Sequence, residues 1–197
     1  MGQSLDLCFV SRSATTWGML GKALAKAGLQ RSGGDEQVIS YYQWHRGIET
    51  VQLGADVHQG AYDPSRGPGP HYVTVFLPDR YFPRENVIEA SRELFQDFLI
   101  LGENIWEQLS FDEGMLAPED TGFFLSRMDT PDEKDLVELA SWSYAHFTSP
   151  EIQPRLRLSA CVKNMHPEPK IISIANGGLL MIWDDSPSGV ARFLSLF

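Results

Sequence analysis

Three histidines have residue types and spacing that could support metal chemistry. His45, His58 and His71 stand 13 residues apart, each near one of three successive expected strands. Neighbouring strand ends can bring imidazoles together as zinc ligands. Side-chain alternation opposes this, because His58 falls on the polar side of its strand while His71 shares a side with the apolar Val73 and Val75. No HExxH motif or Cys/His cluster accompanies them, so we expect no metal site.

Residues for covalent chemistry are sparse. Cys8 and Cys161 fall inside expected strands, which favours two buried free thiols. The sequence contains no GxSxG, SxxK, GxxxxGK[ST] or GxGxxG motif. Asp184 and Asp185 precede Pro187 and are typical of a solvated turn. We therefore expect no catalytic residue and no cofactor, although a small hydrolase or transferase with a site between two sheets stays open as an alternative.

The first half of the chain predicts four strands and two helices. Residues 5–10, 38–45, 51–57 and 72–77 are expected strands, and 51–57 alternates strictly between apolar and polar positions. A helix is expected over 15–27, ending at Gly28. A second is expected from Pro83 to Leu101, with Gly102 ending or kinking it. Its buried stripe is expected to consist of Val87, Ser91, Leu94, Phe95 and Phe98.

The second half predicts a similar order. Residues 123–128 are an expected strand, and the capping box of residues 130–133 starts a helix whose apolar side includes Tyr144 and Phe147. A strand follows over 156–162. Two further strands, 171–175 and 179–183, flank Asn176 and two glycines, a strong hairpin signal. Residues 188–197 are expected to form a final short helix.

These elements predict an α+β fold in a single globular unit, residues 1–197. Two similar β-α-β-β-β-α halves, 1–102 and 122–197, would be joined by an acidic linker, 103–121. Each half would form a mostly antiparallel sheet with helices packed on one face. The tetrapeptides FVSR at 9–12 and FLSR at 124–127 stand at the same place in the two halves, which favours this pseudo-repeat.

The negative charge of the chain is concentrated in one stretch. Residues 103–138 hold eleven acidic and two basic residues, a balance of −9 out of −10 for the whole chain. Such a field repels nucleic acid and anionic lipid and attracts a basic partner. No apolar run approaches the length of a membrane span, and the N-terminal segment lacks the regions of a signal peptide. We expect a cytoplasmic protein that binds neither nucleic acid nor membrane.

The acidic stretch is also the predicted partner-binding surface. Acidic residues alternate there with aromatic and large apolar ones, which suits a surface where aromatic residues anchor and charges steer. Trp106 and Phe111 are the expected anchors. The expected contact charges are Asp112, Glu113, Glu119, Asp120 and Asp129. A solvated linker with a few core residues remains the alternative.

Two segments resemble a known family. GADVHQGAYDPSRGPGPHYVTVFLP, followed by an amphipathic helix, resembles the centre of certain bacterial polymorphic-toxin immunity proteins, and GGLLMIWDDSP resembles their C-terminal segment. The resemblance implies a small cytoplasmic protein that binds and neutralises a cognate toxin with a basic surface. A nuclease toxin would suit an acidic inhibitor, because nucleases carry positive charge for phosphate. An acidic adaptor or effector chaperone stays open as an alternative, and the sequence leaves the oligomeric state unknown.

Overall fold

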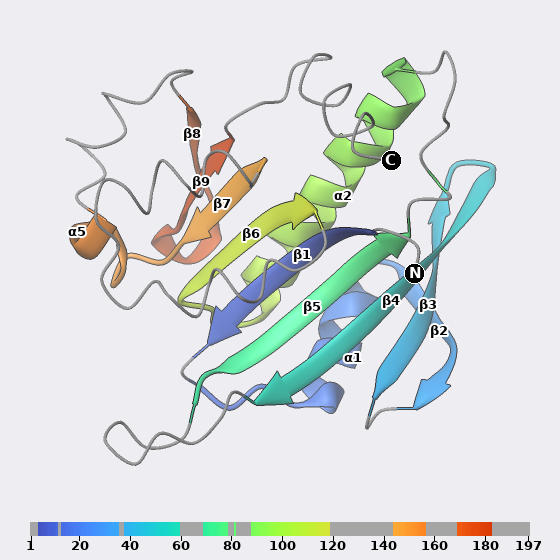
Figure 1. Ribbon diagram of the computed structural model, residues 1–197, viewed down its shortest axis with the longest axis horizontal. Helices are drawn as coiled ribbons and strands as arrows, with labels where there is room; N and C mark the ends of the chain where they lie inside the picture. Colours follow the sequence, from blue (N-terminus) through green and yellow to red (C-terminus); the bar gives the residue numbers. More distant parts are fainter. Residues whose placement is uncertain are drawn as a thin grey trace.

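The fold is built on an antiparallel sheet with two long helices behind one face (Figure 1). The computed structural model describes residues 4–11, 13–35, 38–59, 69–78, 81, 88–118, 144–156 and 169–182. Its helical elements are α1 (Trp17–Lys26), α2 (Ile88–Gln108), the short α5 (Gln153–Leu156) and the 3-10 turn η3 (Ala175–Gly177). Its strands are β1 (Ser4–Ser11), β2 (Leu29–Asp35), β3 (Ile39–Arg46), β4 (Glu49–Gln59), β5 (His71–Pro78), β6 (Glu113–Pro118), β7 (Ala145–Thr148), β8 (Lys170–Ser173) and β9 (Leu179–Ile182).

All nine described strands belong to one sheet. Their order is β2-β3-β4-β5-β1-β6-β7-β9-β8, and each neighbouring pair is antiparallel. The first strand, β1, therefore lies inside the sheet between β5 and β6. The α+β class is confirmed, but the described strands form one sheet rather than the two that the pseudo-repeat predicted.

The similarity of the two halves is not confirmed. The first half contains a strand that the sequence did not predict, β2, so its order is β-α-β-β-β-β-α. Several expected elements of the second half lie outside the described residues: the strand 123–128, most of the helix after residue 130, most of the strand 156–162 and the helix 188–197. The hairpin around Asn176 is confirmed, because β8 and β9 pair on either side of it.

The hydrophobic core lies between the sheet and the two long helices. Leu5, Leu7 and Phe9 of β1 are completely buried and belong to the same core cluster as the inner side of α2. In the predicted stripe of α2, the three described side chains are buried as expected, namely Leu94, Phe95 and Phe98. Residue 87 and the side chain of residue 91 lie outside the description.

An aromatic cluster fills the core beneath β1, β6 and β7. Phe9 stacks on Phe111 with ring centroids 4.7 Å apart, and Trp106 stacks on Phe147 at 5.7 Å. Phe9 also meets Phe147 edge to face at 5.4 Å. Aromatic pairs in these geometries contribute about 0.5–1.5 kcal/mol beyond the burial of their area. Trp106 and Phe111 are therefore core residues.

Helix α2 continues past Gly102 to Gln108, so the glycine does not end it. A β-carbon at Gly102 would stand 2.8 Å from a methyl carbon of Leu7, so a larger residue would force the Leu7 side chain to shift. The last turn is capped from a distant segment. The side-chain amide of Asn176 donates to the carbonyl oxygens of Trp106 (3.4 Å) and Glu107 (3.5 Å). Asn176 does so from the left-handed region, with φ 59°.

The predicted linker is ordered secondary structure as far as it is described. Residues 103–108 complete α2, and Glu113–Pro118 form β6. Four consecutive residues of β6 are buried, namely Gly114, Met115, Leu116 and Ala117. A strand that is covered on both faces has a continuous run of apolar residues instead of alternating apolar and polar ones.

Two other predicted elements differ from the structure. Residues 145–148 form β7, where the sequence predicted the end of a helix. Leu156 ends α5 instead of beginning a strand. Among the described helices, none has both the length and the apolar character needed to cross a bilayer.

Candidate functional site

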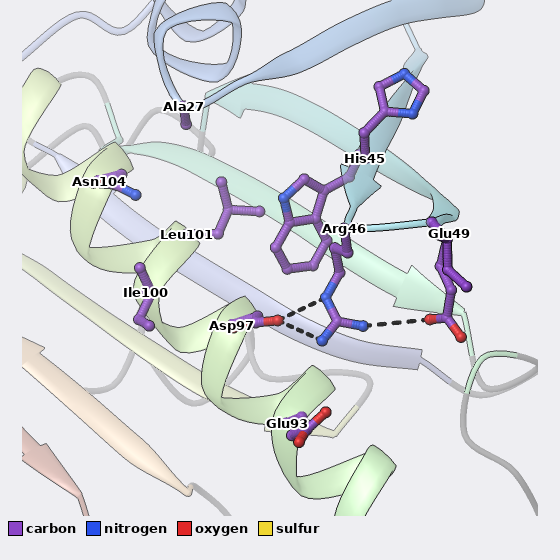
Figure 2. A pocket seen from close by; sticks show the side chains of 12 residues that line it. Ala27, His45, Arg46, Glu49, Glu93, Asp97, Ile100, Leu101 and Asn104 are labelled. Atoms are coloured by element: carbon purple, nitrogen blue, oxygen red, sulfur yellow. Dashed lines mark hydrogen bonds and ion pairs between the residues drawn. The ribbon is translucent and has the colours of Figure 1, made fainter.

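A groove lies where the β3–β4 turn meets the outer side of α2 (Figure 2). We call it the hairpin groove. It is lined by Ala27 at the end of α1, by residues 44–49 of the hairpin, and by Glu93, Asp97, Ile100, Leu101 and Asn104 of α2. Its volume is about 530 Å³, which is large enough for several side chains of a partner.

The tip of the hairpin holds an aliphatic side chain entirely in solvent. Arg46 and Glu49 are cross-strand partners, so Gly47 and Ile48 form a two-residue turn. Gly47 takes φ 57°, the left-handed conformation that such turns require. Ile48 at the tip is 104% exposed. Its apolar surface stays in water unless another molecule covers it.

Helix α2 has a core side and a groove side. Leu94 and Phe98 are buried against the sheet. The groove side carries residues at spacings of four, three and four, which one side of a helix brings into line. These residues are Glu93, Asp97, Ile100 and Asn104. Ile100 is 53% exposed, so the groove has a second accessible aliphatic side chain.

Arg46 ties the hairpin to α2. Its Nε donates to Oδ2 of Asp97 at 2.8 Å, and its Nη2 donates to the same oxygen. Its Nη1 lies 3.7 Å from Oε2 of Glu49, and its guanidinium stands 5.4 Å from the centre of the Trp44 ring. The Arg46 side chain is only 14% exposed. Figure 2 shows it held between the two carboxylates. All three guanidinium nitrogens are thus engaged within the chain.

The groove has an excess of negative charge. Three carboxylates, those of Glu49, Glu93 and Asp97, stand against the single guanidinium of Arg46, which leaves a formal charge of −2. Glu93 lies one turn of α2 before Asp97 and on the same side of the helix (Figure 2). Within the described part of the chain, the Glu93 side chain makes no hydrogen bond or ion pair. The groove is therefore suited to a cation.

The described lining of the groove offers three carboxylates, one guanidinium, one imidazole and aliphatic surface. Among the described residues, no side chain with a hydroxyl or thiol group lines the groove. The described cysteine, Cys8, is buried in β1, and burial raises its pKa to about 12. Its thiolate is therefore scarce at neutral pH, and the thiol is not placed to act as a nucleophile. Cys161 lies outside the described residues.

The structure separates the residues that the sequence predicted as the partner-binding surface. Trp106 and Phe111 are 2% and 6% exposed, and Glu113 is 6% exposed, so all three side chains serve the interior. Asp112 is half-buried at the start of β6, where its backbone bonds to Val10 and Ser149. Glu119, Asp120 and Asp129 lie outside the described residues, and their part in binding stays a prediction.

Glu113 is buried beside a histidine that the sequence did not indicate. His146 of β7 is 0% exposed, and neither of its ring nitrogens has a hydrogen-bond partner among the described residues. Nε2 of His146 lies 4.0 Å from Oε2 of Glu113. Burial lowers the pKa of His146 to about 4, so the imidazole is neutral at pH 7. The two side chains therefore do not form an ion pair at neutral pH.

The three equally spaced histidines do not converge. His45 bonds to Thr50 at 3.0 Å on an exposed part of the sheet. His58 bonds to Asp56 at 3.1 Å and stacks on Tyr72 at 5.0 Å. His71 precedes Tyr72 in β5 and so points to the opposite face. Among the described residues, no group of three or more potential ligands could hold a metal ion. Asp184 and Asp185 lie outside the description.

Sequence reasoning missed the hairpin groove because its two sides are far apart in the chain. Arg46 and Asp97 are 51 positions apart. The detectable local signal was the Arg-Gly-Ile-Glu sequence of residues 46–49, an aliphatic residue after glycine between two charged ones, which is unusual at the tip of a hairpin. No family model, curated protein or solved structure shows significant similarity to this chain, so the resemblance to immunity proteins remains a hypothesis.

Proposed function

We propose that this chain is an immunity-type binding protein that neutralises a cognate bacterial toxin in the cytoplasm. The observation that carries the proposal is the hairpin groove, where a fully exposed Ile48 stands beside three carboxylates. An exposed aliphatic side chain with charged residues around it is the composition of a protein-binding surface. The resemblance of residues 54–78 and 177–187 to immunity proteins supports the same function.

The charge of the chain supports a basic partner. The net charge is −10, and most of it arises from residues 103–138. A toxin that acts on nucleic acid presents positive charge for phosphate, and an acidic inhibitor would be drawn to that surface. In this proposal the groove makes the close contact. Asp112, Glu119, Asp120 and Asp129 contribute to the long-range field that speeds encounter.

Co-expression with the toxin gives the direct test. The toxin domain encoded by the gene next to that of this protein would be expressed in a bacterial host from one inducible promoter, and this chain from another. We expect this chain to restore growth and the purified proteins to form a complex in size-exclusion chromatography. A host that still dies, with no complex between the purified proteins, would refute the proposal. So would a neighbourhood without any toxin gene, whereas a complex without rescue would favour the adaptor alternative.

A further inference from the structure

We infer that the hairpin groove receives a lysine or arginine side chain of the partner, and that Ile48 packs against an aliphatic patch beside that cation. The inference rests on the proposed function and specifies the chemistry of the bound surface. The proposed occupant is thus a basic segment of the partner with an apolar residue next to its cation.

The charges of the groove favour a cation over an anion. Apart from His45, Arg46 is the sole basic side chain among the described lining residues, and Asp97, Glu49 and Trp44 already engage it. An anion would therefore meet three carboxylates and no available donor of full positive charge. A partner cation, by contrast, would find the exposed Glu93 carboxylate one turn from Asp97. A cation in the groove would be attracted by the Glu93 carboxylate even where both charges are partly exposed to water.

The aliphatic side chains decide what must lie beside the cation. Ile48 at the hairpin tip and Ile100 on α2 both line the groove, and both are exposed. Covering them requires apolar surface on the partner, because a polar surface placed there would lose its water without compensation. The bond between Arg46 and Asp97 joins the hairpin to α2, which limits the movement of the hairpin and so reduces the entropy lost on binding.

Two groove substitutions, one distant control and one variant in the acidic stretch test the inference against the same toxin domain. Glu93→Lys replaces the accessible carboxylate with a cation, and Ile48→Asp replaces the tip residue. Glu151→Lys makes the same charge change at an exposed turn before α5, at the opposite end of the sheet from the hairpin (Figure 1). Asp112→Lys makes it in the predicted acidic stretch. Circular dichroism and thermal unfolding of each variant would show that the fold is retained.

The expected results distinguish a specific contact in the groove from a general effect of net charge. Glu93→Lys should slow association about tenfold at low salt, since a repulsive charge would face the partner cation. Ile48→Asp should weaken the equilibrium affinity by about 30-fold or more, the effect of losing a central anchor. Glu151→Lys should change neither constant by more than about twofold, because it is distant from the contact.

Three outcomes would overturn the inference. One is that the wild-type protein binds the toxin domain and both groove variants bind it with the same affinity. Another is a loss of affinity confined to Asp112→Lys, which would move the contact to the acidic stretch. The third is a dimer of this chain alone that Ile48→Asp converts to a monomer, which would make the groove a contact between two copies. A wild-type protein that binds no toxin would instead refute the proposed function, so the two failures can be told apart.

Discussion

The hairpin groove and the β6–β7 region each bring a basic and an acidic side chain together, with opposite results. In the groove, Arg46 bonds to Asp97, whose side chain is 44% exposed. In β6 and β7, His146 and Glu113 lie 4.0 Å apart but are almost completely buried. Water near the groove stabilises the charges there, whereas burial keeps His146 neutral. Burial rather than proximity therefore decides which of the two pairs is ionic.

The comparison also shows that acidic density along the sequence does not by itself indicate an exposed surface. In the described part of the acidic stretch, Glu113 of β6 is buried, Glu103 and Asp112 are half-buried, and Glu107 is exposed. The groove has fewer acidic residues, but its side chains are accessible. Charge counted along the sequence predicts the field around the molecule, and exposure decides where a partner can make contact.

The largest expected difference between the two regions is in stability. Trp106→Ala removes a side chain that stacks on Phe147 and packs near Phe9, so we expect it to lower the free energy of unfolding by about 3–5 kcal/mol. Ile48→Ala at the hairpin tip should change it by less than about 0.5 kcal/mol. Urea denaturation followed by tryptophan fluorescence and circular dichroism measures both. Equal effects of the two substitutions would contradict the assignment of Trp106 to the core and Ile48 to the surface.

The second difference is in pH dependence. His146 has a folded-state pKa of about 4, below the ordinary histidine value of 6.5, so the unfolded chain binds the proton more readily. The contribution of His146 to the free energy of unfolding is therefore complete above pH 6.5, and it should be lost as the pH falls from 6.5 to about 4. The loss from this residue should reach about 3 kcal/mol, by the free energy that corresponds to one pKa unit.

A leucine substitution isolates this contribution. Denaturation midpoints between pH 7 and pH 4 should fall less steeply for His146→Leu than for the wild type. His45→Leu is the matched control, because it makes the same substitution at an exposed histidine. Identical slopes in the wild type and His146→Leu would show that His146 is not the residue that resists protonation.

The smallest expected effect concerns the ion pair between Arg46 and Asp97. Asp97→Asn removes the charge but keeps the shape, and it should cost about 0.5–1 kcal/mol at low salt, as is usual for a partly exposed ion pair. At an ionic strength of about 1 M the difference should shrink, because the Debye length falls to about 3 Å. If Asp97→Asn destabilises the protein by more than about 1 kcal/mol and salt does not change this value, the Arg46–Asp97 pair behaves like a buried ion pair. The contrast between the exposed pair in the groove and the buried pair in β6 and β7 would then be wrong.

Sequence patterns predicted the elements in which local alternation and burial agree. β4 alternates, and α2 has a regular apolar stripe, so both were recognised. β2 is exposed at every position except Leu29, and it contains Gly33 and Gly34, so it carries no alternation to detect. β6 is buried on both faces and therefore lacks a period of two, and its acidic neighbours suggested a linker.

The candidate site depends on contacts that local patterns do not encode. The groove forms only where the β3–β4 turn lies against α2, and the long-range bond between Arg46 and Asp97 joins these two elements. The exposure of Ile48 follows from its place in a two-residue turn, which depends on the register of β3 and β4. Similarly, Trp106 has a residue type suited to anchoring a partner. Its burial is known only once β7 brings Phe147 against it.

The central position of β1 has a consequence for how the chain is made. β1 precedes both of its neighbours in the sequence, since Leu5 lies beside Leu77 on one side and Pro118 on the other. During synthesis its apolar residues leave the ribosome long before β6 exists, with both strand edges open. Such a segment invites pairing with other chains until the sheet closes. Productive folding thus depends on chaperone protection or on fast closure once residue 118 has emerged, and high expression rates should favour aggregates nucleated by residues 4–11.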